Sequence, residues 1–361
     1  MRILQVYKDV FPFTNGGIER YIHDLSSFLA QRGHEVAVLT AGSGLRQKSA
    51  SVSGFTVIEL PALGRVLSNP ISLSYGRAMR RWRPDVAHFH LPLPTAEVAR
   101  LMDPGETPFI ATYHSDIVRQ AFLLPLYGPL LKKFLKRAFL VLATSGRYAR
   151  TSPYLKGLDN LRVVPIGVDL SHFAPGSEGR ADHFLFVGRF RSYKGIQILL
   201  DAWKAMASPP PLVLAGGGPM EGWIRERITA LPVRIILNPT DDELLALYRT
   251  AAALVLPSDR RSEAYGMVQL EAMACGTPVI STNLPTGVPW VNRHMKTGLV
   301  VPPGNATALA EAVARIRDDG PLSQELSRGA LERAQRTFDS KRLFQEVESC
   351  LTEAASRSPR R

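Results

Sequence analysis

Cysteine is scarce in this chain of 361 residues, which contains only Cys275 and Cys350. Two cysteines exclude a disulfide framework and argue against a zinc site built from cysteine. Long apolar runs are also absent, because Lys and Arg interrupt every stretch that approaches the roughly 18–20 residues of a membrane-spanning helix, including 122–143. The first residues lack the apolar stretch and cleavage site of a signal peptide. We therefore expect a protein of the reducing cytoplasm without membrane-spanning helices.

Acidic residues are few in the first half of the chain. Residues 1–170 carry 21 Lys and Arg against 12 Asp and Glu, a net charge of +9, whereas residues 171–361 carry 23 against 20, a net charge of +3. This asymmetry suggests that the first half meets an anionic partner, which could be a nucleic acid, a membrane surface or a phosphorylated substrate. Ordinary solubility charge is the alternative.

The length suggests two domains of roughly 100–200 residues each. In both halves short β-branched runs follow amphipathic stretches, and no run alternates polar with apolar residues. This pattern is typical of α/β domains with doubly wound parallel sheets, whose strands are covered by helices on both faces. The expected strands span residues 2–6, 35–40, 55–60, 85–89, 108–112, 139–143 and 161–165, then 183–187, 211–215, 233–237, 253–256, 278–281 and 299–301, with helices at 306–317 and 340–355.

The expected domain boundary lies between Asp169 and Asp182, where the chain is polar, contains glycine and lacks periodicity. Ligands of two-domain, doubly wound proteins bind at the carboxyl ends of the strands, in the cleft between the domains, so the loops that follow strands are the candidate sites. The predicted parts are 1–170, 182–340 and a C-terminal helix within 341–361 that packs back toward the first domain.

The loop after the first strand contains paired glycines. Asn15, Gly16 and Gly17 precede a helical pattern, and glycines at a helix start let backbone N–H groups approach a phosphate or a sugar closely. The spacing is not that of a dinucleotide fingerprint. A ligand contact and a plain turn are both open.

Three histidines follow or end expected strands. His114 lies among hydroxyls and a carboxylate, so it could hydrogen-bond a polar substrate, handle a proton or be structural. His88 and His90 lie two residues apart without a third ligand at metal-site spacing. We interpret both as cleft-lining or core residues.

Two cations of the second half lie next to the end of an expected strand. Gly188 and Arg189 close the strand, and Lys194 follows five residues later. A guanidinium that can bind bidentately and an ammonium group suit a diphosphate whose leaving-group charge must be neutralised. Arg191 could replace either cation, so the individual assignment stays open.

A short helix is expected at 266–275, before the strand that Pro278 opens. Its amino end, Gly266-Met267-Val268, would direct free N–H groups toward a ligand. Glu263 precedes the helix and Glu271 lies inside it, so the two carboxylates could accept from the hydroxyl pairs of a sugar and a ribose in one elongated ligand. Two solvated glutamates are the alternative, which the apolar neighbours of Glu271 disfavour.

These motifs resemble the retaining glycosyltransferases of family 4, which have the GT-B fold of two Rossmann-like domains facing across a cleft. Arg189 with Lys194, and Glu263 with Glu271 eight residues later, look like the donor signature of that family. The resemblance covers essentially the whole chain, because the further matching segments occur in order: Gly16-Gly17, His114, Gly216-Gly217-Gly218-Pro219 and Leu256-Pro257-Ser258.

The resemblance implies that the first domain binds the acceptor and the second binds the nucleotide sugar, with no metal or other cofactor. Arg189 and Lys194 would hold the donor diphosphate with the backbone N–H groups of Met267 and Val268. The glycines expected to lie against the donor are Gly16, Gly17, Gly188 and Gly266.

The resemblance also implies roles for the remaining polar residues. Glu271 would bind the ribose, Glu263 the hydroxyls of the transferred sugar, and His114 that sugar from the other domain. Asp241 corresponds to a base-contacting position, although Asp242 could serve instead. Arg260-Arg261 departs from the family pattern, which puts contacts of that segment in doubt.

Two longer segments, 112–120 and 281–289, look like those of bacterial enzymes that add mannose or D-rhamnose from GDP-sugars to lipid-linked O-antigen or capsule chains. A front-face transfer is then expected, because neither half offers a nucleophilic carboxylate beside the sugar. The alternatives are a UDP-sugar transferase, a nucleotide-sugar epimerase of the same fold and a non-catalytic polyanion-binding protein. The chain contains no nucleic-acid recognition motif.

The basic residues of the first half gather in two expected helices. Arg77, Arg80 and Arg81 have helical spacing, and Lys132 and Lys133 lie in a run that joins cations to large apolar residues. This predicts a peripheral enzyme at the inner face of the cytoplasmic membrane, where a lipid-linked acceptor would be met. A solvated helix face is the alternative.

Overall fold

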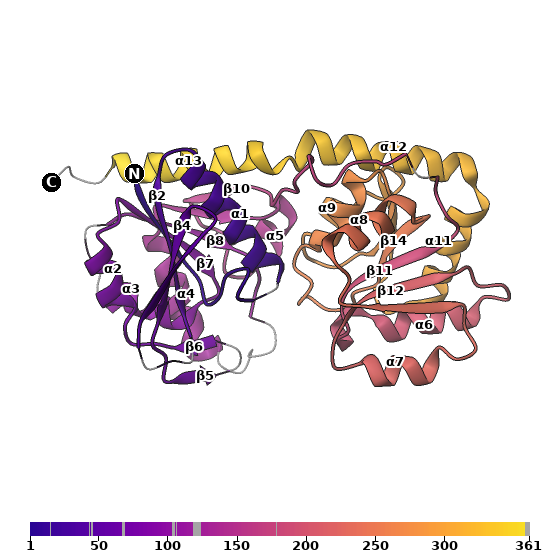
Figure 1. Cartoon of the computed structure of the whole chain (residues 1–361), viewed down its shortest axis with the longest axis horizontal. Helices are drawn as coiled ribbons and strands as arrows, with labels where there is room; N and C mark the ends of the chain where they lie inside the picture. The colour runs from indigo at the N-terminus through magenta and orange to yellow at the C-terminus, as the bar shows by residue number, and fades with distance from the viewer. Residues whose placement is uncertain are drawn as a thin grey trace. The chain divides into compact units, whose positions relative to one another are not determined.

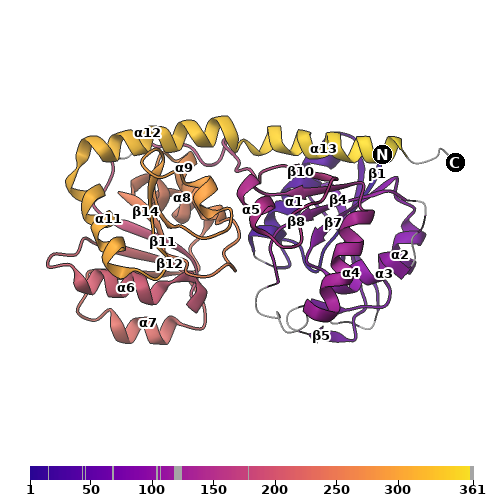
Figure 2. The ribbon, with the colours of Figure 1, turned by 180° about the vertical axis from the view of Figure 1, so that it is seen from behind.

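The computed structural model describes every residue except 15, 43, 45, 67–68, 103–104, 106, 118–123, 178 and 358–361. The chain forms two compact units (Figures 1 and 2). Unit 1 comprises Met1–Pro165 with Lys341–Arg361, and unit 2 comprises Ile166–Ser340. No helix among the described residues is long and apolar enough to cross a membrane.

The chain passes between the units twice, and the first passage lies before the polar segment expected as the boundary. Val168 forms a parallel bridge with Asp339, and its N–H donates to the carbonyl of Phe338 at 2.7 Å. Near the end of the segment, the Ala181 N–H donates to the carbonyl of Thr250 at 2.7 Å. The described residues of the expected boundary segment, 169–177 and 179–182, therefore belong to unit 2.

Unit 1 is built on an eight-stranded sheet in the order β10-β9-β8-β7-β1-β2-β4-β3. All its pairs are parallel except β3 with β4. The strands at the predicted positions agree within two residues. These are β1 (Arg2–Val6), β2 (Glu35–Ala41), β4 (Phe55–Leu60), β7 (Val86–Leu91), β8 (Phe109–Tyr113), β9 (Leu140–Ala143) and β10 (Leu161–Val163).

Three strands of unit 1 were not predicted. The edge strand β3 (Lys48–Val52) is almost wholly exposed and contains no apolar run, and β5 (Gly64–Val66) and β6 (Asn69–Ile71) form a short separate hairpin. The side chains of β3 and β5 are exposed almost throughout, and β6 has only three residues, so none of these strands produces an apolar run. The helices of this unit are α1 (Gly17–Gln31), α2 (Tyr75–Trp82), α3 (Pro94–Met102), α4 (Leu124–Arg137), α5 (Gly146–Thr151) and α13 (Ser340–Ser356).

The last helix, α13, packs on unit 1. The ring of Phe344 lies 5.8 Å from that of Tyr21 and 5.6 Å from that of Phe28, both on α1. Glu348 accepts from His34 at 2.9 Å, and Arg162 on β10 pairs with Glu353 at 3.2 Å. Aromatic packing and polar contacts therefore fix α13 to both α1 and the sheet edge.

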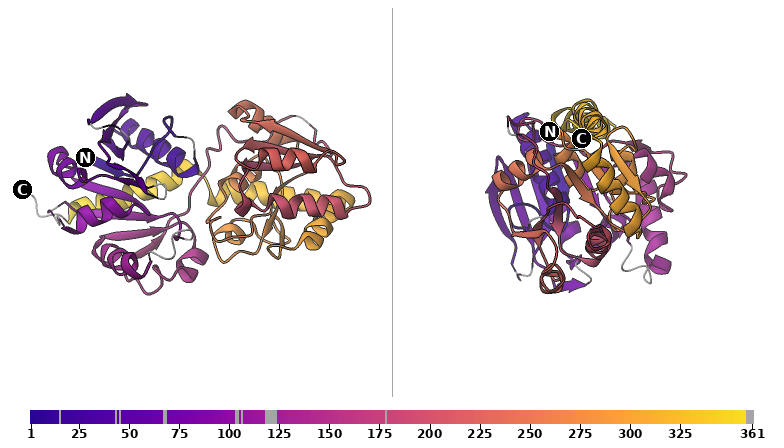
Figure 3. Two further views of the ribbon diagram at one scale, coloured as in Figure 1. Left: turned by 90° about the horizontal axis from the view of Figure 1, so that it is seen from below. Right: turned by 90° about the vertical axis from the view of Figure 1, so that its right-hand side faces the viewer.

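Unit 2 is built on a fully parallel six-stranded sheet in the order β13-β12-β11-β14-β15-β16. Each strand lies within two residues of its predicted position, and helices cover both faces of the sheet (Figure 3). The strands are β11 (Phe184–Arg189), β12 (Leu212–Gly217), β13 (Val233–Leu237), β14 (Ala253–Leu256), β15 (Val279–Thr282) and β16 (Gly298–Val301). The helices are η2 (Ser192–Lys194), α6 (Ile196–Ala205), α7 (Glu221–Arg227), α8 (Asp241–Thr250), α9 (Met267–Ala274), α10 (Val288–Val291), α11 (Ala306–Asp318) and α12 (Gly320–Thr337).

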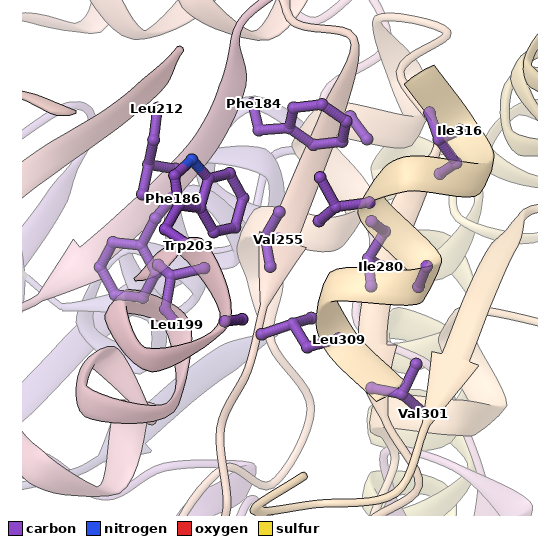
Figure 4. Packing of buried hydrophobic residues seen from close by; sticks show 14 of the residues in the cluster. Phe184, Phe186, Leu199, Trp203, Leu212, Val255, Ile280, Val301, Leu309 and Ile316 are labelled. Carbon is purple, nitrogen blue, oxygen red and sulfur yellow. The ribbon is translucent and has the colours of Figure 1, made fainter. Parts of the chain in front are cut away.

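The core of unit 2 lies between the sheet and helices α6 and α11 (Figure 4). Phe184 and Phe186 extend from β11 toward Trp203 and Leu199 of α6, while Leu309 and Ile316 enter from α11. All these side chains are buried. This packing fixes β11 and the start of α6, which frame the loop that carries Lys194.

Candidate active site

The functional side chains of unit 2 follow the carboxyl ends of its parallel strands, which lie at one edge of the sheet. Arg189 is the last residue of β11, and Lys194 ends the short helix η2 just after it. The next residue, Gly195, has a φ of 70°, and a Cβ there would lie 2.0 Å from the carbonyl oxygen of Pro257. Glycine at this position therefore lets the Lys194 loop pack directly against the loop that follows β14.

Lys194 and Glu263 form an ion pair across these two loops. Lys194 Nζ lies 2.7 Å from Glu263 Oε2, and the buried Ser258 donates its Oγ–H to the same oxygen at 2.9 Å. Burial lowers the pKa of Lys194, but the charge and hydrogen bond of Glu263 outweigh it and hold that pKa above its ordinary value. Lys194 is therefore a cation fixed in direction by a buried carboxylate.

The two arginines near Lys194 differ from it. Arg189 is exposed, and Arg191 is partly exposed. Neither makes a hydrogen bond or ion pair with another side chain in the part of the chain that the structure describes. Both remain able to bind an anion, so the structure leaves the choice between them open.

The amino end of α9 follows Gly266, which has a φ of 76°. No side chain caps this end, so the N–H groups of Met267 and Val268 lie where a helix most favours an anion. Glu271 is part-buried in the second turn, and its Oε2 accepts a hydrogen bond from the Tyr248 phenol at 2.5 Å. The helix thus brings two N–H groups and one carboxylate together.

The predicted base-contacting residues lie in the first turn of α8, which follows β13. Thr240 and Glu243 form a capping box there, so the helix start is fixed by its own side chains. Asp241 and Asp242 both lie beside this cap and are exposed. The structure does not choose between them.

Unit 1 places its candidate glycines at the start of α1. Gly16 is the residue before the helix and Gly17 its first residue, without a side-chain cap. Asn15 lies outside the described residues, as do residues 118–120 of the segment 112–120.

His114 lies in a buried hydrogen-bonded group at the ends of β1, β7 and β8. Its Nε2 lies 3.0 Å from His90 Nδ1, and His90 Nε2 lies 2.8 Å from Gln5 Oε1. Burial lowers the pKa of His114 to about 3, so the ring is neutral. Only 3 % of the residue is exposed, and its Nδ1 is buried without a hydrogen-bond partner among the described residues. A sugar contact at this nitrogen requires movement of the residues that cover it.

The other two histidines of unit 1 are core residues. His88 and His90 are fully buried, and His88 Nε2 bonds Thr112 Oγ1 at 2.7 Å. The sequence allowed either a core role or a cleft-lining role for these two histidines. Their burial assigns both to the core.

The basic residues predicted to meet a membrane are exposed on α2 and α4, which both pack against α3 (Figure 2). On α4 the cations lie beside two exposed leucines, Leu126 and Leu130. We call these residues the basic face. Its members are Arg77, Arg80, Arg81, Leu126, Leu130, Lys132 and Lys133.

Two polar partners in unit 2 were not predicted from the sequence. Ser258 is the second residue after β14, and its position close to a strand end was a usable signal. Tyr248 precedes Glu271 by 23 residues in another helix. No spacing links the two, so only the fold brings them together.

The two Rossmann-like units, together with the family models that match them, place the chain among the GT-B glycosyltransferases. Residues 15–172 match the family model described as "Glycosyltransferase Family 4", and residues 168–333 match "Glycosyl transferases group 1". The chain belongs to glycosyltransferase family 4.

Curated relatives match along almost the full chain. The "O-antigen chain mannosyltransferase C" of Escherichia coli is 33% identical over 358 residues, which cover 94% of both chains. The "D-rhamnosyltransferase WbpZ" of Pseudomonas aeruginosa is 34% identical over 353 residues, covering 94% of this chain and 92% of its own. The protein is therefore a glycosyltransferase related to O-antigen mannosyl- and rhamnosyltransferases.

Solved structures agree on the fold. A sucrose-phosphate synthase from Thermosynechococcus elongatus superposes with a TM-score of 0.82 at 23% identity, covering 98% of each chain. WaaG, described as a glycosyltransferase involved in lipopolysaccharide biosynthesis, gives a TM-score of 0.70 at 17% identity, covering 97% of this chain and 99% of its own.

Proposed function

We propose that this enzyme transfers mannose or D-rhamnose from a GDP-sugar to a lipid-linked glycan in bacterial O-antigen or exopolysaccharide synthesis. In this proposal unit 2 binds the donor and unit 1 the acceptor. The observation that carries it is the Lys194–Glu263 pair beside Arg189 and the uncapped end of α9. The choice of sugar rests on the names of the two curated relatives.

The residues of unit 2 suit the departure of a nucleoside diphosphate. One N–H of Lys194 bonds Glu263, which leaves two N–H groups for phosphate oxygens. Arg189 and the N–H groups of Met267 and Val268 add positive potential where negative charge grows as the sugar–oxygen bond breaks. We assign the neutralisation of the leaving diphosphate to this group, without a metal ion.

We propose that the acceptor hydroxyl attacks the face from which the diphosphate leaves, with retention of configuration. Glu263 is bonded to Lys194 and Ser258, an arrangement suited to holding sugar hydroxyls rather than to attacking the anomeric carbon. The departing phosphate would take the acceptor proton. Analysis of the product anomer by NMR, with the transfer run in EDTA, tests retention and metal independence together.

The donor assignment predicts a selective thermal shift. Among GDP, UDP, ADP and their sugars, GDP-mannose or GDP-rhamnose is expected to raise the melting temperature without divalent metal, because a ligand that binds only the folded state stabilises it. Glu271→Ala is expected to abolish the shift, since it removes the proposed ribose contact.

Other outcomes of this panel separate the alternatives. A response to UDP-sugars alone would replace the donor base but keep the transferase. Donor consumption without an acceptor would favour an epimerase. Absence of any nucleotide response at saturating concentration would contradict the donor site as a whole.

We also propose that the basic face binds an anionic membrane. Its exposed leucines lie beside cations, and each Lys or Arg near an anionic bilayer contributes about 1 kcal/mol. Lys132→Ala with Lys133→Ala is expected to weaken binding to vesicles containing phosphatidylglycerol by roughly 30-fold.

Vesicle sedimentation measures this effect, and high salt should reduce binding. The matched control is Lys204→Ala with Lys296→Ala, two exposed lysines of unit 2. Equal loss in both double variants would show a general charge effect and refute a specific basic face.

A further inference from the structure

Tyr248 has a place in unit 2 that the proposed donor contacts do not use. It is fully buried in α8, and its phenol reaches α9 to donate to Glu271 Oε2 at 2.5 Å. Glu271 itself is part-buried and so remains in contact with solvent. The phenol therefore binds one carboxylate oxygen of a residue that is itself partly exposed to solvent.

The position of Tyr248 is itself fixed by its surroundings. Its backbone carbonyl accepts a hydrogen bond from the hydroxyl of the buried Thr277, which follows the end of α9. The ring of Phe173 packs edge-on against it, with 6.0 Å between ring centroids. Tyr248 is thus hydrogen-bonded both to Glu271 in α9 and to Thr277 just beyond the end of that helix. The phenol is therefore held in place and cannot move with the carboxylate when the Glu271 side chain rotates.

The protonation states define the direction of this hydrogen bond. Burial, followed by the charge of Glu271, raises the pKa of Tyr248 well above its ordinary value. The phenol therefore keeps its proton at neutral pH and donates, while the Glu271 oxygen accepts. A carboxylate with one oxygen held by a fixed donor loses rotational freedom before a ligand arrives, which reduces the entropy cost of binding.

We propose that Tyr248 is a positioning residue that orients the Glu271 carboxylate toward the vicinal hydroxyls of the donor ribose. This rests on the proposed assignment of Glu271 to the ribose. Tyr248 does not touch the nucleotide in this scheme, and its effect should appear only on ligands that carry the ribose hydroxyls.

The test uses calorimetric titration to compare the binding of ribonucleotides and dideoxynucleotides in two tyrosine variants. The ligands are GDP and 2′,3′-dideoxy-GDP, with UDP and its dideoxy analogue in parallel. Tyr248→Phe is expected to weaken binding of the ribonucleotide about tenfold, the usual order for a hydrogen bond to a charged group, and to change dideoxynucleotide affinity by less than about twofold. In the transfer reaction KM for the donor should rise while kcat holds.

Tyr127→Phe is the matched control. Its phenol donates to the buried carboxylate of Glu97 in unit 1, so the substitution removes the same kind of bond outside unit 2. It should leave the ratio of ribonucleotide to dideoxynucleotide affinity unchanged. Thermal unfolding without ligand checks that both variants are folded.

The outcomes separate this inference from the function on which it rests. Equal weakening of both ligands in Tyr248→Phe, or no change in either, overturns the positioning role while the donor site stands. If the wild-type protein binds ribonucleotide and dideoxynucleotide equally, the ribose assignment of Glu271 fails, and the role of Tyr248 fails with it.

Discussion

Replacing Lys194 with alanine is expected to lower kcat by roughly 10²–10³-fold, the usual cost of removing one group that stabilises developing negative charge. Two effects act together. The leaving diphosphate loses a fixed cation, and the buried Glu263 carboxylate loses the ion pair at 2.7 Å that compensates its charge. Steady-state kinetics with the donor identified by the thermal-shift panel measure the change.

Arg191→Ala is the control for this prediction, because Arg191 lies three residues before Lys194 but, unlike Lys194, makes no side-chain ion pair in the described part of the chain. It should keep kcat within a few-fold of the wild-type value. If Arg191→Ala lost as much activity as Lys194→Ala, both cations would be required and the effect would not be specific to Lys194. Normal activity in Lys194→Ala would show that the Lys194–Glu263 ion pair is not needed for catalysis.

Trp203→Ala is expected to reduce the free energy of unfolding of unit 2 by about 3–5 kcal/mol, as is typical when a large buried aromatic side chain is deleted. The ring is fully buried against Phe184, with 5.9 Å between ring centroids. Its indole N–H donates to the carbonyl of Pro210 at 2.8 Å, and the substitution leaves that buried carbonyl without this donor. Urea denaturation measures the loss.

Trp203→Phe separates packing from polarity in the same experiment. It retains most of the buried apolar volume but not the N–H, so a smaller loss than in Trp203→Ala is expected. A loss below about 1 kcal/mol in Trp203→Ala would contradict the assignment of this ring to the core.

Burial explains which parts of the fold could be predicted. Strands such as β11 and β14 are covered on both faces, so they appear in the sequence as apolar runs, and both sheets were predicted from them. The strand β3 has no such signal because its side chains face solvent. Helix α12 was missed because it begins with Gly320 and Pro321, which also mark turns, and contains Gly329 in its interior.

The site was predictable where its residues are close in the sequence. Arg189 and Lys194 follow one strand, and Glu263 and Glu271 flank one helix start, so local spacing was enough to group them. The direct pairing of Lys194 with Glu263 was not foreseen, because it depends on how the loops after β11 and β14 approach at Gly195. The burial of His114 likewise depends on three strands that spacing alone does not align.

The placement of α13 has a consequence for how the chain is made. Unit 2 is one continuous segment, whereas unit 1 consists of residues 1–165 and a helix that comes after the whole of unit 2. During synthesis from the amino end, the sheet of unit 1 emerges first but lacks the helix that covers Tyr21 and Phe28 until about 175 further residues have been added. Unit 1 therefore gains its last helix only after the whole of unit 2 has been translated, although its sheet is made first.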